Sequence, residues 1–173
     1  MRIEAVVGDI TRQRVDAVVN AANRGMRGGG GVDGAIHSAG GPDILADCVE
    51  RFPDGLPTGE AGWTTGGRLH AQWVIHVVGP NYNVGETDRG LLTSCYRRAL
   101  EVADEVGART IAFPLISAGI FGWPMDDAID AAVETIRDTP TEVEVARIVA
   151  FGRPTYELVA ARLRRLQESP VDR

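Results

Sequence analysis

Strand-like and helix-like patterns alternate along this chain, and this alternation restricts the possible folds more than any other feature of the sequence. Short β-branched runs occur at Ile3–Val7, Val15–Val19, Trp73–Val78, Thr110–Phe113 and Val143–Phe151. Amphipathic helical patterns occupy Leu91–Val106, Pro124–Thr139 and Arg153–Gln167. Because a helix between two strands acts as a crossover connection, the sequence predicts an α/β fold with a largely parallel sheet covered on both faces.

Length and composition indicate one globular domain. The chain has 173 residues, of which 44% are hydrophobic and 24% charged, which is enough to bury a core unaided. We assign residues 1–167 to a single domain and expect residues 168–173 to form a flexible tail.

Charge and cysteine usage narrow the function classes. The net charge of −6 argues against binding of long nucleic acid, which requires a basic face. No run approaches the roughly 18 apolar residues of a membrane span, so we expect no membrane partner. Cys48 and Cys95 lack C-x-x-C spacing and a small disulfide framework. We therefore expect both cysteines in the core and the protein in the cytoplasm.

Two glycine-rich loops each follow a predicted strand. The first contains Asn20, Asn23, Gly28–Gly31 and Asp33, and the second belongs to a stretch from Ile111 to Pro124 that begins within a predicted strand. Such loops leave backbone N–H groups uncovered, and a helix starting after them adds positive potential. Together they predict a pyrophosphate site that needs no lysine, with short polar side chains beside it to fix hydroxyls or a water.

Three polar clusters converge on one edge of the predicted sheet. Gly8–Thr11, Asn20–Asp33 and Ser117–Phe121 each follow a strand-like run. Ligands of open α/β sheets bind beyond the carboxyl ends of the strands. The sequence therefore predicts a site for a nucleotide-like ligand at this edge.

The order of these motifs resembles that of the macrodomain family, in particular its ADP-ribose-hydrolysing branch. The matching segments cover about residues 1–165, in the family's order: Gly8–Thr11, Val19–Asn23, Gly28–Asp33, Thr58–Ala61, Val74–Pro80 and Ser117–Gly122. The resemblance implies a three-layer α/β/α sandwich around a mixed, largely parallel sheet, with an ADP-ribose cleft at its crest.

The resemblance also implies roles for individual residues. Asn23 and Asp33 would flank the distal ribose and carry catalysis, with Asp33 orienting a water. Asp9 would accept the adenine amino group. The other implied ligand-binding residues are Ile10 beside the adenine, Asn20, the backbone of Gly31 and Val32, the diphosphate loop Ser117, Ala118, Gly119, Ile120 and Phe121, and Phe151 as an apolar wall for the adenine.

Three positions depart from the family pattern. Where the family usually has Ser-Thr-Gly-Ile-Tyr-Gly, this chain has Ala118 and Phe121, which removes two hydroxyls and keeps an aromatic ring. We expect backbone-led phosphate binding to survive that change. Ser38 stands where the family often has a basic residue, which alters the charge near the phosphate entry.

Each polar residue also has a purely structural interpretation. Asp9 could cap a turn, Asn20 and Asn23 could occupy left-handed turn positions, and Asp33 could be the N-cap of a short helix over Gly34–Ala39. The joint order of the motifs favours the ligand-binding interpretation, and Asp33 could fill both roles.

Other motifs fail their structural context. His37, His70 and His76 have no carboxylate or thiolate that completes a metal-ligand set, so we expect no metal. Gly29–Gly34 fits G-x-G-x-x-G but lies too far past the strand for a dinucleotide turn. Ser117 lacks the glycine that a nucleophile elbow requires, because Leu115 stands there.

The resemblance therefore predicts a hydrolase that cleaves the bond between the distal ribose of ADP-ribose and an acyl oxygen. Its substrates would be proteins ADP-ribosylated on Asp or Glu, O-acetyl-ADP-ribose, or both, with no cofactor. The alternative is a non-catalytic ADP-ribose reader, and Asp33 favours the enzyme because a reader needs no carboxylate there. A third possibility, an ADP-ribose-binding regulator of RNA or of a nuclease, is not supported, because the sequence indicates no basic surface.

Overall fold

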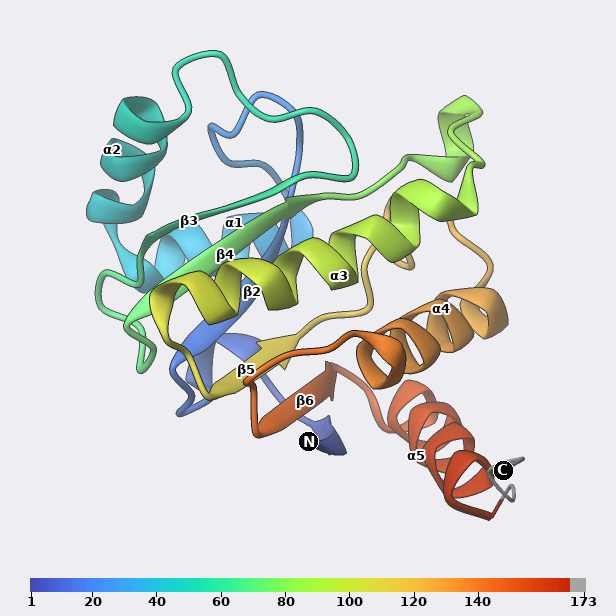
Figure 1. Cartoon of the computed structure of the whole chain (residues 1–173). Coiled ribbons are helices and arrows are strands. Elements are labelled where there is room, and N and C mark those ends of the chain that lie inside the picture. Colours follow the sequence, from blue (N-terminus) through green and yellow to red (C-terminus); the bar gives the residue numbers. More distant parts are fainter. Residues whose placement is uncertain (169–173) are drawn as a thin grey trace.

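A six-stranded mixed sheet forms the centre of the molecule (Figure 1). The computed structural model describes residues 1–168. The strands lie in the order β1-β6-β5-β2-β4-β3, and only the edge strand β3 is antiparallel to its neighbour. Their bounds are β1 Arg2–Val7, β2 Ala17–Ala22, β3 Ala61–Thr65, β4 Trp73–Val78, β5 Thr110–Phe113 and β6 Val145–Ala150.

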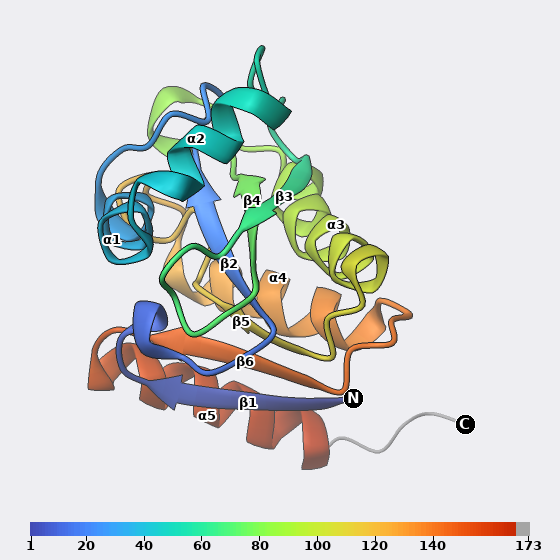
Figure 2. The ribbon, with the colours of Figure 1, turned by 90° about the vertical axis from the view of Figure 1, so that its left-hand side faces the viewer.

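Helices cover both faces of this sheet, which makes a three-layer α/β/α sandwich. The bounds are α1 Gly31–Gly40, α2 Pro42–Arg51, α3 Arg89–Val106, α4 Met125–Asp138 and α5 Arg153–Glu168, with short 3-10 turns η1 Ile10–Arg12 and η2 Tyr82–Val84. Helices α1 and α2 lie on one face and α3 to α5 on the other (Figure 2). A buried apolar cluster fills each interlayer space. No helix in the described part of the chain is long and apolar enough to cross a membrane.

The predicted fold class is confirmed, and most predicted elements coincide with observed ones. Two were missed. Strand β3 is short and contains Gly62, and both glycine and alanine are weak strand formers. Helix α2 buries only Ile44 and Cys48, so its apolar stripe is narrow. Strand β2 also extends to Ala22, so Asn20 lies within the strand and not in the loop after it.

The first helix begins earlier than the sequence predicted. Helix α1 starts at Gly31, its N-cap is Gly30, and Asp33 lies in its first turn. The structural interpretation of Asp33 as the N-cap of this helix is therefore wrong. The predicted C-terminal tail lies outside the described residues except for Glu168, which belongs to α5.

Candidate functional site

A cleft opens where the carboxyl ends of the parallel strands meet. It consists of two adjoining cavities of about 340 and 360 Å³ that share Gly31, Val32, Pro114, Val149 and Phe151. The first also contacts the second glycine-rich loop, and the second reaches Asp9 and Ile10. The three loops predicted to converge therefore do line one continuous groove.

The second glycine-rich loop presents a row of backbone donors. Among the described residues, no hydrogen bond starts from the backbone N–H groups of Ser117, Gly119, Ile120 or Phe121. Ser117 has φ +64°, a left-handed conformation that is uncommon outside glycine. Uncovered N–H groups along a loop with left-handed residues form a concavity suited to anions. The loop that the sequence predicted to hold the diphosphate therefore has backbone donors available for an anion.

Contacts on the outer side of this loop hold it in shape. Asn83, which the sequence analysis did not single out, donates from Nδ2 to the Ile120 carbonyl at 2.8 Å and from its backbone N–H to the Phe121 carbonyl at 3.2 Å. The Ile120 carbonyl and the Phe121 N–H belong to the same peptide group, in which they point in opposite directions. Because Asn83 binds the carbonyl, the Phe121 N–H is turned away from Asn83. At the base of the loop, the Ile116 N–H donates to the buried Tyr96 hydroxyl at 2.9 Å.

The first turn of α1 faces the second loop across the cleft. Gly31 has φ +59°, and Gly30 caps the helix with no side-chain hydrogen bond. The first N–H groups of a helix have no partner within it. The Ile120 Cδ1 would lie 3.6 Å from a Cβ placed on Gly31, so the exposed Ile120 side chain approaches the first loop.

Asp33 is a buried carboxylate held from one side. It is 4% exposed, and its Oδ1 accepts from Asn20 Nδ2 at 2.8 Å and lies 3.3 Å from His37 Nε2. Its other oxygen faces the first loop, because a Cβ on Gly29 would lie 3.1 Å from Asp33 Oδ2 and 3.2 Å from Asn23 Nδ2. The two residues predicted to be catalytic therefore both approach the same glycine.

Behind Asp33, a chain of polar contacts runs into the core. Asn20 Nδ2 also lies 3.0 Å from His76 Nδ1, and His76 Nε2 lies 2.8 Å from Thr64 Oγ1. Burial lowers the pKa of His76 to about 3, so the ring is neutral at physiological pH. Nδ1 then accepts from Asn20 and Nε2–H donates to Thr64. This arrangement orients Asn20, which in turn orients Asp33.

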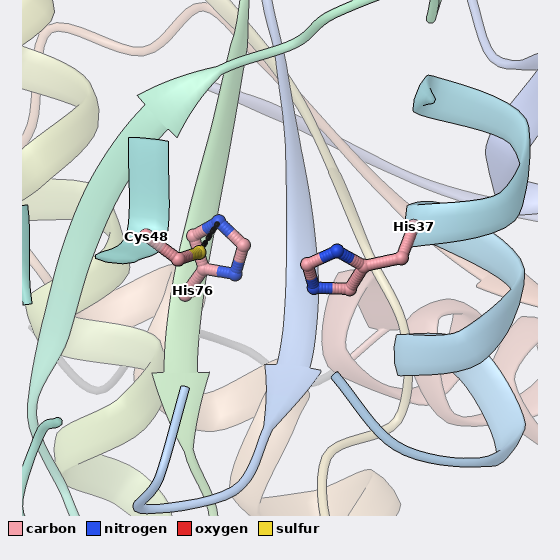
Figure 3. Close-up of side chains that lie close together, drawn as sticks. All are labelled: His37, Cys48 and His76. Atoms are coloured by element: carbon pink, nitrogen blue, oxygen red, sulfur yellow. Dashed lines mark hydrogen bonds between the residues drawn. The ribbon is translucent and has the colours of Figure 1, made fainter. Parts of the chain in front are cut away.

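His37, Cys48 and His76 lie close together, with one ligand-type atom of each within 4.8 Å of the others (Figure 3). The thiol comes from α2, which explains why the sequence showed no thiolate near these histidines; the exposed His70 is not in the group. Burial raises the pKa of the Cys48 thiol to about 11. Both His76 nitrogens and His37 Nε2 already have polar partners. The expectation that no thiolate accompanies these histidines is therefore wrong, and the polar contacts of the two rings form a hydrogen-bonded network.

Asp9 and Phe151 border the second cavity. Asp9 caps η1, accepting from the Thr11 N–H at 2.9 Å and the Thr11 hydroxyl at 2.7 Å. These hydrogen bonds hold the pKa of Asp9 below its usual range. Phe151 is 91% exposed although it is a large apolar side chain. An exposed ring above an apolar cavity is suited to stacking on a planar ligand.

The predicted site residues fall into three groups. Those that line the first cavity are Gly31, Val32, Ser117, Ala118, Gly119, Ile120, Phe121 and Phe151, and Asp9 and Ile10 line the second. Asn23 and Asp33 line neither cavity but meet at Gly29, behind the first loop. Asn20 is fully buried and reaches the site only through Asp33. The Ser117 hydroxyl is buried against Gly79 and has no partner among the described residues.

The chain is similar to proteins of one family. The profile of the Macro domain family matches residues 19–132. A macro domain-containing protein of Streptomyces coelicolor is 57% identical over 165 residues, which are 93% of this chain and 98% of that protein. The Oceanobacillus iheyensis macrodomain with ADP has a TM-score of 0.89 at 39% identity, covering 96% of this chain and 92% of that one. The Trypanosoma brucei macrodomain in complex with ADP-ribose has a TM-score of 0.84 at 35% identity, covering 94% and 69%.

Proposed function

Because the chain belongs to the macrodomain family, we propose that it binds ADP-ribose and hydrolyses its ester bond to an acyl oxygen. The substrates would be proteins modified on Asp or Glu, O-acetyl-ADP-ribose, or both. Solved relatives carry ADP and ADP-ribose. The bound nucleotide would place its adenine beside Asp9 and Phe151 and its diphosphate against the Ser117–Phe121 loop.

The Ser117–Phe121 loop and the start of α1 together support a bent pose for the ligand. The Ser117–Phe121 loop and the first turn of α1 line the same groove, and the unpaired N–H groups of both can donate to phosphate oxygens. A diphosphate held at this point positions the distal ribose near Gly29, between Asn23 and Asp33. Fixing the reacting bond in this way lowers the entropic part of the barrier.

The buried carboxylate of Asp33 is the observation that carries the catalytic part of the proposal. One oxygen is fixed by Asn20 and His37, and the other faces the same glycine as the Asn23 amide. In the proposed reaction a water attacks the ester while Asp33 accepts a proton from it, and the acyl or anomeric C–O bond breaks. Asp33 then returns that proton to the departing ribose alkoxide or carboxylate, so that ADP-ribose and a free carboxylic acid leave and the Asp33 carboxylate is restored. Asn23 would hold a ribose hydroxyl. A module that only binds ADP-ribose has no need of this carboxylate.

Substitution of Asp33 tests the proposal. Asp33→Ala should reduce turnover of an Asp- or Glu-linked ADP-ribosyl peptide by at least about 100-fold, the lower range for a positioned general base, with a much smaller change in ADP-ribose affinity. Asp43→Ala, which removes an exposed carboxylate from the first turn of α2, is the matched control and should leave turnover unchanged. If Asp33→Ala is as active as the parent protein, the reader function replaces the hydrolase.

A further inference from the structure

A separate pocket lies between α1 and α2, outside the cleft described above. We call it the α1–α2 pocket. It has a volume of about 340 Å³ and is lined by Arg27, Gly28, His37, Ser38, Gly41, Pro42, Leu45 and Arg68. None of these residues lines either cavity of the cleft.

One wall of this pocket is a positioned guanidinium group. Gly41 has φ +82°, and a Cβ placed on it would lie 2.5 Å from an Arg68 Nη atom, so the absence of a side chain there makes room for the Arg68 guanidinium. The Arg68 N–H donates to the Gly40 carbonyl at 2.9 Å, which anchors the backbone. Within the described residues, no carboxylate forms an ion pair with Arg68.

The second cation of the pocket also lacks an acidic partner among the described residues. The two terminal nitrogens of Arg27 donate to four carbonyl oxygens, those of Met26, Cys48, Phe52 and Pro53, which hold the guanidinium in place without a negatively charged partner. Most other arginines described pair with carboxylates, including Arg24, Arg51 and Arg162. In a chain of net charge −6, two uncompensated arginines at one concave site favour a negatively charged occupant.

The pocket adjoins the proposed catalytic pair. His37 lines it and reaches Asp33 Oδ1 at 3.3 Å, and Gly28 lines it and accepts from Asn23 Nδ2 at 3.2 Å. From Asp33, in the first turn of α1, to Gly41 at its C-cap the helix rises about 12 Å at about 1.5 Å per residue. An extended peptide spans that length in about four residues, at roughly 3.3 Å each, so a spacing of three to five residues covers it.

We propose that the α1–α2 pocket binds an Asp or Glu side chain of the ADP-ribosylated acceptor protein, three to five residues away from the modified side chain. This inference rests on the proposed function, because it assumes that the acceptor chain leaves the distal ribose beside Asn23 and Asp33. The carboxylate would meet the Arg68 guanidinium, which can bind it through two parallel N–H groups.

Matched peptides test the proposal. Two mono-ADP-ribosylated peptides carry the same modified Glu and differ only in having Glu or Gln three to five residues from it. We expect kcat/KM to be about three- to tenfold higher for the acidic peptide at low salt, the range of one partly exposed charge pair. Arg68→Ala should abolish this difference and leave turnover of O-acetyl-ADP-ribose unchanged, since that substrate has no peptide. Arg14→Ala, which removes an exposed arginine elsewhere, should preserve the difference.

Equal kcat/KM values for the two peptides would overturn the proposal, as would a preference that survives Arg68→Ala or is lost equally in Arg14→Ala. Calorimetric affinities of the same two peptides show whether equal kcat/KM values reflect a wrongly assigned pocket or a failure of the proposed hydrolase function. A protein that binds ADP-ribose but hydrolyses neither peptide should still bind the acidic one more tightly if the pocket is correctly assigned. If it does not, the pocket assignment is wrong independently of catalysis.

Discussion

Asp33 is the residue in which structural and proposed chemical roles coincide. Two neighbours fix Oδ1, while Oδ2 faces the glycine loop beside Asn23. Its position in the first turn of α1 also places the negative charge where the helix dipole stabilises it. The sequence predicted that Asn23 and Asp33 would lie together, but not the network behind them, because Asn20 and His76 meet only through the pairing of β2 with β4.

The buried His76 ring should make the protein sensitive to acid. Its pKa is about 3 in the folded state against 6.5 for an exposed histidine, so below pH 6.5 the unfolded chain binds a proton that the folded protein does not. The free energy of unfolding should fall by about 1.4 kcal/mol per pH unit from this group between pH 6.5 and pH 3. Urea denaturation of the parent and of His76→Gln across that range measures the slope. Identical slopes for the two proteins would contradict this assignment.

Gly119 allows a clean test of the phosphate loop. A Cβ at this position would meet no protein atom within 4 Å, so Gly119→Val should fold normally. Its branched side chain would project where we place the diphosphate. We expect ADP-ribose affinity to fall at least about tenfold, measured by calorimetry. Phe121→Tyr is the matched control in the same loop, and it should change the binding free energy by less than about 1 kcal/mol.

A folded Gly119→Val protein with full ADP-ribose affinity would show that this loop does not hold the phosphates. The proposed pose of the ligand would then be wrong. If Phe121→Tyr keeps its affinity while Gly119→Val loses it, the pose is supported. In that pose the phosphates are bound by backbone N–H groups and not by side-chain hydroxyls.

At the level of elements, strongly patterned segments were predictable and weakly patterned ones were not. Helix α3 was placed from its amphipathic pattern. In the structure the Asp88 side chain caps its start, and Gly107 ends it at φ +77°. Strand β3 escaped prediction because Gly62 leaves room for the Phe52 ring, whose atoms would lie 2.5 Å from a Cβ there. That packing depends on the fold and leaves no periodic signal in the sequence.

The contact between α1 and the first glycine loop should be intolerant of a methyl group. A Cβ on Gly34 would lie 2.6 Å from the Gly29 carbonyl oxygen, which is backbone and cannot rotate away. Glycine to alanine within a helix normally stabilises by up to about 1 kcal/mol. Here we expect Gly34→Ala to lower the free energy of unfolding by about 1–3 kcal/mol and to weaken ADP-ribose binding. Ser38→Ala, at an exposed position of the same helix, should leave both quantities nearly unchanged.

Urea denaturation and calorimetry on the two α1 variants check this prediction. If Gly34→Ala is as stable as the parent and binds ADP-ribose equally well, the close packing of helix and loop has no role in shaping the site.

For the whole molecule, the cleft length should determine which nucleotides bind. Its two cavities together extend from Asp9 to the Ser117–Phe121 loop. AMP fills only the adenine end, so it should bind much more weakly than ADP-ribose, for which we expect micromolar or tighter affinity. Equal affinities measured by calorimetry would mean that the groove was wrongly assigned.

The overall architecture was predictable because parallel α/β sheets place every loop after a strand at one edge. The position of the cleft could be predicted from that rule. The α1–α2 pocket could not be predicted, because Arg27 and Arg68 are brought together by α2, a helix that the sequence pattern did not reveal.

The central claim is hydrolysis of an acyl-linked ADP-ribose, and product analysis tests it most directly. The unmodified protein is incubated with peptides carrying one ADP-ribose on Glu, Asp, Ser or Arg and with O-acetyl-ADP-ribose, and the products are resolved by mass spectrometry. We expect free ADP-ribose from the Glu or Asp peptide or from O-acetyl-ADP-ribose, together with the unmodified acid, and its loss in Asp33→Ala. Binding of ADP-ribose without release from any acyl-linked substrate would contradict the account and identify the protein as a reader.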